Sequence, residues 1–390
     1  MITLTTAEDA LKTLYLGVVA EQLNLKTDPL LTKIEQTSQD VWGKELVKLV
    51  PYGINGGIGC GSEVGALPMA SSNAYTQFKT TLKNIFGTIE ISDKAIRASE
   101  NTAGAFVNLL TNEMEGLIKA SKYNLSRMLY GDGSGLISTG NIDYQNFNSP
   151  YYLPIQDPKY LHPGLVIEVY EQNGESIGSA RIKEVLEVDR YVVLDNPLKA
   201  VPGENVSIYV QGSKDNEITG LKGIAFNDTI YGLDRFTNDW LKPYISENGS
   251  SSSMTFGMLQ QIEDNIEEKF NSSVNYIATT YDLRRAYVKL LDTNRRNIDY
   301  MELDGGFKSV AFNGVPMVAS KFIDRGSMYF INSDDFKMHQ LCDWRWLESE
   351  NGKILQQKPG LPVFTATLVK YAELICDRPG AMGVVTGLTK

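Results

Sequence analysis

The chain has 390 residues, a length that suits two or three compact units. Its 47 acidic residues outnumber its 37 basic residues, so the net charge is −10 with the two histidines neutral. Binding to nucleic-acid phosphates depends on clustered lysine and arginine. The densest basic clusters are two arginine pairs, Arg284 with Arg285 and Arg295 with Arg296. The composition therefore disfavours nucleic acid as the ligand of the surface as a whole.

Apolar residues make up 42% of the chain and charged residues 22%, as in ordinary globular proteins. Cys60, Cys342 and Cys376 are odd in number and form no CxxC pair, which fits a reducing compartment. The first eight residues lack the segments of a secretory signal, and no stretch reaches the ~18 apolar residues of a membrane span. We therefore expect a soluble product, made in the cytosol, whose fold uses no disulfide.

The N-terminal part of the chain combines one helical pattern with two extended ones. Apolar residues recur at helical spacing over 6–25, which predicts an amphipathic helix. Residues 44–53 favour a strand, and residues 75–92, rich in Thr, Ile and Phe, favour its return. The segment between them predicts a long loop at the tip of an extended hairpin, with glycine at positions 56, 57, 59, 61 and 65 and proline at 68.

Such a hairpin is physically unusual. A two-stranded ribbon buries little apolar area, is marginal alone in water, and leaves backbone groups unpaired at its edges. Two interpretations remain open: a flexible surface loop, or an arm that packs on another subunit. The second provides the partner surface that the ribbon needs.

The strongest helical pattern in the chain covers residues 102–130. Its apolar stripe includes Phe106, Met114 and Leu125, and a helix of this length measures about 40 Å. The pattern ends in a glycine-rich stretch at 131–135, where glycine permits the left-handed backbone of a helix end.

Beyond this helix the composition changes twice. Short β-rich runs separated by turn residues at 150–217 predict an inserted β domain, a small barrel or sandwich. From residue 218 the pattern is mixed α/β. It predicts helices at 255–270 and 281–291, strands at 275–279, 308–318 and 327–332, and a long strand at 363–371.

The sequence offers no constellation typical of an enzyme, so we expect no catalytic, cofactor-binding or metal-binding residues. The glycine-rich stretches at 57–61 and 131–135 lack the strand-then-helix context of a phosphate loop. His339 and Cys342 could form a nucleophilic pair, but their apolar surroundings favour a packing segment. Two isolated histidines and scattered cysteines have no zinc-ligand spacing.

Several short sequence motifs, taken in their order along the chain, resemble those of the major capsid proteins of tailed bacteriophages with the Hong Kong 97-type fold. No single motif is specific; the resemblance comes from their shared order over most of the chain outside 150–217. They are Glu63–Pro68, Gly87–Ser92, Leu129–Ser134, Gly220–Ile224, Thr229–Asp234, Gly305–Phe307, Phe312–Pro316 and Trp344–Trp346.

The resemblance implies an α+β fold in which an extended loop laps over a neighbouring subunit and a long spine helix supports the peripheral domain. It implies an N-terminal arm at 1–43, the extended loop at 44–92, a peripheral domain with the spine helix at 93–149, an inserted all-β domain at 150–217, an axial domain at 218–345, and a return to the peripheral domain at 346–390. The inter-subunit contacts expected in the loop are Tyr52, Gly57, Gly59, Leu67, Pro68 and Phe78.

In function, the resemblance implies a major head protein that self-assembles through pentamers and hexamers into an icosahedral virion capsid around double-stranded DNA, in the host bacterial cytoplasm. An acidic lining would contact that DNA only weakly. The hairpin is reached by residue 44, so we expect a separate scaffolding protein, along with a portal; decoration proteins and an isopeptide cross-link through Lys79 or Lys83 stay open. The alternatives are an encapsulin-like compartment, or a hydrolase or carbohydrate-binding protein that uses the β insertion.

Overall fold

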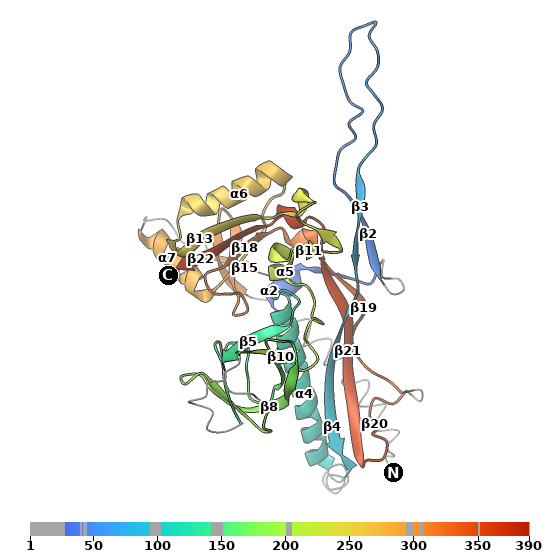
Figure 1. The fold of residues 1–390 in the computed structure, drawn as a ribbon, viewed down its shortest axis with the longest axis vertical. Coiled ribbons are helices and arrows are strands. Elements are labelled where there is room, and N and C mark those ends of the chain that lie inside the picture. The colour runs from blue at the N-terminus through green and yellow to red at the C-terminus, as the bar shows by residue number, and fades with distance from the viewer. Residues whose placement is uncertain are drawn as a thin grey trace. The chain divides into compact units, whose positions relative to one another are not determined.

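The computed structural model describes residues 28–39, 41, 45–93, 103–141, 151–199, 205–293, 300–303, 307–349 and 352–389. The helix predicted at 6–25 lies outside these residues, as does most of the expected arm at 1–43. The fold mixes helices and strands, as predicted, and divides into two compact units (Figure 1). The first unit is Met1–Tyr130 with Ile218–Lys390, and the second is Gly131–Glu217.

One sheet of the first unit is built on a long antiparallel pair, β21 (Val363–Cys376) with β4 (Lys83–Ser92). Helix α4 (Ala103–Met128), predicted from its apolar stripe, lies against β4. Gly87 permits this close approach, because a Cβ there would lie 2.8 Å from Leu117 Cδ1. The sheet also contains β1 (Glu35–Thr37), β19 (Phe336–Trp346) and β20 (Gln356–Gln357), and α2 (Pro29–Lys33) precedes β1.

The single return strand predicted over 75–92 is in fact two strands. β3 (Tyr75–Thr80) pairs with β2 (Leu46–Pro51) in a two-stranded sheet, whereas β4 pairs with β21. The chain leaves one partner and joins the other at residues 81–82, which belong to neither strand. A pattern that reports extended backbone does not report which strand the backbone pairs with, so the sequence alone did not separate the two.

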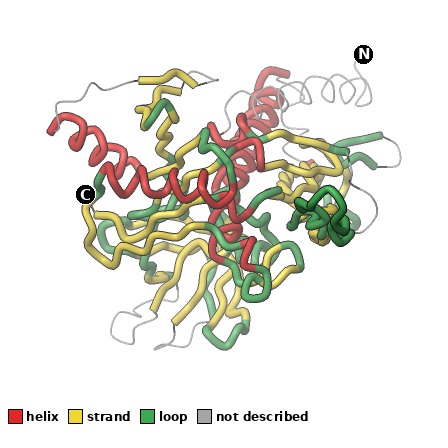
Figure 2. The backbone as a smooth tube through the Cα atoms, turned by 90° about the horizontal axis from the view of Figure 1, so that it is seen from above, coloured by secondary structure: helices red, strands yellow, loops and turns green. Residues whose placement is uncertain are grey.

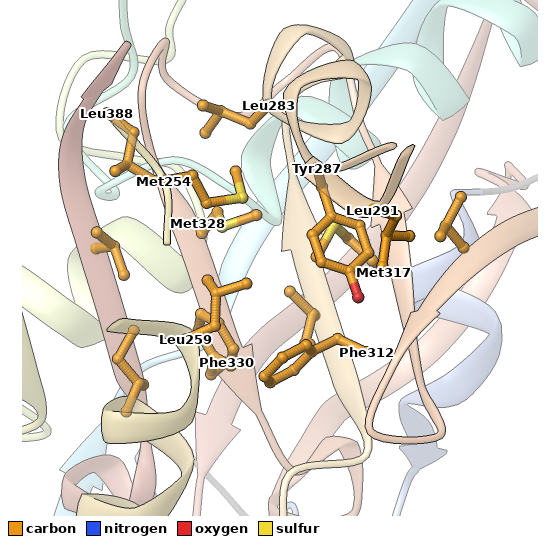
Figure 3. Close-up of a cluster of buried hydrophobic side chains, with 14 of the residues drawn as sticks. Met254, Leu259, Leu283, Tyr287, Leu291, Phe312, Met317, Met328, Phe330 and Leu388 are labelled. Atoms are coloured by element: carbon orange, nitrogen blue, oxygen red, sulfur yellow. The ribbon is translucent and has the colours of Figure 1, made fainter. Parts of the chain in front are cut away.

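The second large sheet of the first unit has seven strands, and Figure 2 shows strands side by side with helices along them. Helices α6 (Phe256–Phe270) and α7 (Tyr281–Thr293) pack apolar side chains on it. The core that they share with the strands includes Leu259, Tyr287 and Phe330 (Figure 3). In spatial order the strands are β13 (Tyr244–Ser253), β22 (Gly383–Thr389), β18 (Met328–Ile331), β14 (Tyr276–Thr279), β17 (Val315–Ala319), β16 (Phe307–Phe312) and β15 (Tyr300–Leu303).

Local signals set the ends of several of these elements. Thr255 caps α6 by accepting a hydrogen bond from Met258 N at 3.3 Å, and Asn271 ends the helix with φ 46°. The strand predicted at 308–318 is interrupted by Asn313 and Gly314, whose φ angles of 50° and 80° make the tight turn between β16 and β17.

Residues 218–243 form short elements that hold the chain against the first sheet. Gly220 is required there, because a Cβ would lie 2.3 Å from the carbonyl oxygen of Met128. The buried Arg235 donates to the carbonyl oxygens of Ile224 and Ala225 and so completes the end of the helix before it. The elements are α5 (Leu221–Phe226), β11 (Thr229–Ile230), β12 (Leu233–Asp234) and the 3₁₀ turn η1 (Asp239–Leu241); two more 3₁₀ turns, η2 (Ser333–Asp335) and η3 (Pro379–Ala381), flank later strands.

The second unit has its own apolar core within one six-stranded sheet. Gln156, just after β6, donates its N–H to the Thr139 carbonyl oxygen of β5 at 2.7 Å, so the two edges of the sheet approach each other as in a barrel. The unit includes β5, which the predicted β segment at 150–217 did not include. In spatial order the strands are β5 (Leu136–Asn141), β10 (Asn205–Val210), β7 (Val166–Glu171), β8 (Ser176–Leu186), β9 (Tyr191–Leu194) and β6 (Tyr152–Pro154).

A buried carboxyl group lies on β21 in the first sheet. Glu373 is 0% exposed, and its Oε1 accepts hydrogen bonds from Thr219 N at 2.8 Å and Leu374 N at 3.1 Å. Burial raises the pKa of Glu373 from 4.5 to about 7, although the two backbone hydrogen bonds lower it. The folded chain therefore holds a proton at Glu373 over a pH range in which the unfolded chain releases it.

This proton makes the stability of the chain depend on pH. Between pH 4.5 and about 7 the folded state binds more protons at Glu373 than the unfolded state, so its contribution to the free energy of unfolding falls as pH rises and is constant above pH 7. Urea unfolding of Glu373→Gln should lack this fall, which amounts to about 3 kcal/mol. The buried His339, opposite Glu373 on β19, is present in both proteins, so their difference reports Glu373. Parallel profiles for the two proteins would contradict the assignment; Glu63→Gln, at an exposed position, is the control.

Candidate assembly interface

The loop between β2 and β3 is the most exposed part of the described chain. Every residue from Pro51 to Ala74 is exposed except Gly57 and Ala74, which are half-buried. The two strands that carry the loop pair only with each other, and the loop continues from them as a narrow ribbon (Figure 1). A ribbon of this kind buries too little surface to stabilise itself in water.

Large apolar side chains line this exposed loop. Ile54, Ile58, Val64, Leu67 and Met69 are between 79% and 96% exposed. Single exposed apolar residues are normal on protein surfaces, but several gathered on one segment are typical of interaction sites. The loop therefore has the composition of a contact surface.

Glycines let the two arms of the loop run close together. A Cβ at Gly57 would lie 3.2 Å from the backbone nitrogen of Ser71, and one at Gly59 would lie 3.1 Å from Pro68 Cγ. Gly57 also donates its N–H to Asn55 Oδ1 at 2.9 Å. Larger residues at these two positions would push the arms apart and change the shape of the apolar surface.

The base of the hairpin, in contrast, is firmly packed on the first unit by aromatic rings. Phe78 of β3 is 0% exposed and stacks on Trp240, with ring centroids 6.0 Å apart and planes 6° apart. The centroid of Tyr231 lies 5.1 Å from that of Phe78, and Tyr52 stacks on Trp240 at 5.7 Å. We call these four side chains the aromatic anchor.

Polar contacts reinforce the aromatic anchor. Lys48 of β2 forms an ion pair with Asp377 at 2.5 Å, and Lys79 donates its N–H to the Tyr231 carbonyl oxygen at 2.8 Å. The Tyr231 hydroxyl donates to the Leu374 carbonyl oxygen at 3.1 Å and accepts from Cys376 N at 2.9 Å. Burial raises the pKa of this hydroxyl well above its ordinary value, so it stays protonated and keeps both hydrogen bonds.

The residues expected to contact a neighbour fall into two groups. Tyr52, Gly57, Gly59, Leu67 and Pro68 lie in the exposed loop, where a partner could reach them, and Tyr52 also belongs to the aromatic anchor. Phe78 lies in the aromatic anchor and is completely covered by its own chain. Sequence reasoning did not single out Ile54, Ile58, Val64 and Met69, although apolar residues in a glycine-rich loop were a readable signal. It also missed Tyr231 and Trp240, for which no local signal exists.

The residues that the sequence offered as candidates for catalysis, His339 and Cys342, both lie on β19. His339 is buried in β19, 4% exposed and opposite Glu373, while Cys342 is half-buried further along the strand. Across the described residues, no cluster of three or more His, Cys, Asp or Glu side chains could hold a metal ion. None of the helices in the described part of the chain is both long and apolar enough to cross a membrane.

Comparison with known proteins identifies the class of fold. No protein-family model matches the sequence, and no curated protein matches it significantly. Solved structures do match: the capsid asymmetric unit of cyanophage A-1(L) has a TM-score of 0.56 at 12% identity, over 95% of this chain and 93% of that one. The capsid of an empty GTA particle has a TM-score of 0.51 at 10% identity, over 94% and 91%.

These likenesses define the class of fold. The chain has the fold of phage capsid proteins, over nearly its whole length and that of the matched chains. The chain is similar to the cyanophage A-1(L) capsid structure in fold, at a sequence identity of 12%.

Proposed function

We propose that this protein is the major capsid protein of a tailed bacteriophage, which self-assembles into an icosahedral shell around double-stranded DNA. The observation that carries the proposal is the exposed apolar loop held by a buried, stacked aromatic anchor, on a fold shared with phage capsid proteins. A ribbon that cannot be stable alone is built to bury its surface on a neighbour. Closed shells supply that neighbour by repeating one contact through symmetry.

In this proposal each segment has a defined role. Residues 44–92 lap over the adjacent subunit, with Tyr52, Gly57, Gly59, Leu67 and Pro68 at the contact and Phe78 holding the loop to its own chain. α4 serves as the spine helix of a peripheral domain that residues 346–390 complete. Residues 218–345 form the axial domain, which meets its copies in pentamers and hexamers; residues 150–217 are an inserted domain, and 1–43 an arm.

The partners follow from the same proposal. A separate scaffolding protein and a portal direct assembly in the host bacterial cytoplasm, and the finished protein resides in the virion capsid. The net charge of −10 lets the shell enclose DNA without binding it tightly, because like charges on the lining and the DNA repel. The protein has a structural role and no catalytic one.

Electron microscopy of the expressed chain, with and without a scaffolding protein, tests this function. We expect rings, capsomers or closed shells. Protein that stays monomeric under both conditions would refute it. The contents of the shells decide between the proposed function and a cellular compartment: packaging of DNA through a portal supports the phage capsid, and enclosure of a cargo enzyme supports the encapsulin-like alternative.

A further inference from the structure

A cavity of about 460 Å³ lies within the first unit, away from the exposed loop and its aromatic anchor. Four segments that are distant in sequence line it: the start of α2 with Asp28 before it, α4, the start of α7, and the end of β17 with the turn that follows it. β14 and β17 are parallel neighbours that end at Thr279 and Ala319, so the cavity lies at the carboxyl ends of parallel strands. In α/β arrangements this is the position where ligands commonly bind.

The charge of the cavity is opposite to that of the chain. Four basic side chains line it, Lys119, Lys122, Arg284 and Lys321, in a protein whose net charge is −10. The lining contains one carboxyl group, that of Asp28. A cavity with this lining attracts anions.

The carboxyl group of Asp28 is already engaged by its own surroundings. It accepts hydrogen bonds from Leu30 N at 3.0 Å, the Tyr130 hydroxyl at 2.8 Å and the Ser320 hydroxyl at 3.3 Å. Burial raises the pKa of Asp28, although these hydrogen bonds lower it. The lining therefore sets one acidic group, which is hydrogen-bonded within its own chain, against four basic side chains.

Three of the cations also lack acidic partners elsewhere. Within the described residues, Lys119, Arg284 and Lys321 form no ion pair with Asp or Glu. Nearby basic residues outside the cavity do: Lys222 pairs with Asp324 at 2.9 Å, and Arg285 pairs with Asp282. Cations left without carboxylates around one cavity are the arrangement expected of an anion site.

Aromatic rings and a helix start complete the lining. Lys321 Nζ lies 4.3 Å from the centroid of the Tyr123 ring, and the guanidinium of Arg284 lies 5.3 Å from that of Tyr281. These rings hold the cations in place and offer flat surfaces beside them. α7 begins at Tyr281, and the positive end of its dipole faces the same region as Arg284.

We propose that this cavity binds a phosphate group, either free inorganic phosphate or a phosphodiester of nucleic acid. A single carboxylate is satisfied by one arginine, whereas cations that converge from three segments suit a tetrahedral anion that accepts hydrogen bonds from several directions. The inference does not depend on shell formation, because the whole cavity lies in one chain. It also gives Arg284 a role in binding an anion, whereas the composition of the whole surface disfavoured such a role for the arginine pairs.

The test uses unassembled full-length protein at low salt. Calorimetry with inorganic phosphate is one arm, and fluorescence anisotropy with a labelled double-stranded oligonucleotide is the other. We expect Arg284→Gln combined with Lys321→Gln to weaken binding about tenfold or more. Arg285→Gln should bind as the wild type does, because Arg285 is adjacent but outside the cavity. If the double variant misfolds, Lys321→Gln alone provides the test, because it changes an exposed side chain.

The two arms separate the sources of the phosphate. Cavity-dependent binding of inorganic phosphate alone assigns a free anion, and cavity-dependent binding of the oligonucleotide assigns a phosphodiester. The proposal is overturned by absence of binding in both arms, by equal binding in wild type and double variant, or by equal weakening in Arg285→Gln. It is also overturned if a hexaglutamate peptide binds the cavity and neither phosphate probe does, since the ligand would then be an acidic protein segment.

Discussion

Replacing apolar side chains of the exposed loop by serine should abolish assembly and leave the single chain folded. The variant with the largest expected effect combines Ile54→Ser, Ile58→Ser and Leu67→Ser, because all three side chains are more than three-quarters exposed. Burying a large apolar side chain stabilises a contact by about 1.5–3 kcal/mol. Three such losses at every copy of the interface remove most of the free energy that burial of the loop on a neighbour could contribute.

Two measurements on the same samples make this test selective. Sedimentation velocity reports assembly, and urea unfolding of the unassembled chain reports folding, which the triple variant should leave within about 0.5 kcal/mol of the wild type. Val188→Ser is the matched control, because Val188 is 96% exposed but lies in the second unit. Normal shells from the triple variant would show that the loop is not the assembly surface.

Sequence periodicity predicted elements whose stability is local. α4 has a continuous apolar stripe, and its observed bounds, Ala103–Met128, lie within the predicted 102–130. α6 was equally readable, since Thr255 and Asn271 mark its ends. Such signals are properties of a few consecutive residues, so they survive without knowledge of the fold.

Some elements that depend on distant partners were not predicted. β13 is a sheet edge that contains a serine run, so it lacks the alternation of a half-buried strand, and only pairing with β22 makes it extended. β19 was interpreted as a packing segment around Trp344 and Trp346, although it pairs with β21 along most of its length. The burial of Trp344 and Trp346 confirms the packing segment, but the strand was missed there as it was for β13. Both omissions have one cause: the pairing of two strands is specified by two segments, and each alone carries half the signal.

The same distinction applies to the assembly interface. The loop was predictable because glycines and a proline are concentrated in one segment, but its anchor was not. Phe78 was expected at the contact with a neighbour, and nothing near it in sequence indicates that Trp240 covers it. The cavity lined by Arg284 and Lys321 could not be predicted for the same reason, because its basic side chains belong to three segments that are distant in sequence.

Phe78→Ala should destabilise the isolated chain by about 3–5 kcal/mol, the range for removing a fully buried aromatic ring. The ring is the centre of the aromatic anchor, so its loss leaves a cavity beside Tyr231 and Trp240. Urea unfolding of the unassembled protein measures the effect. Phe86→Ala is the matched control: that ring, on β4, is 58% exposed, and its removal should change the free energy of unfolding by less than about 1 kcal/mol.

A double-mutant cycle locates the lost interaction. Phe78 and Trp240 are in contact, so Phe78→Ala combined with Trp240→Ala should destabilise the chain by less than the sum of the two single changes. Assembly should fail in Phe78→Ala as well, but for a different reason from the triple loop variant: the contact surface is intact and its support is loosened. If Phe78→Ala instead left the single chain as stable as the wild type and still blocked assembly, Phe78 would contact the neighbour directly, and the loop would have to leave its own chain to bind the next.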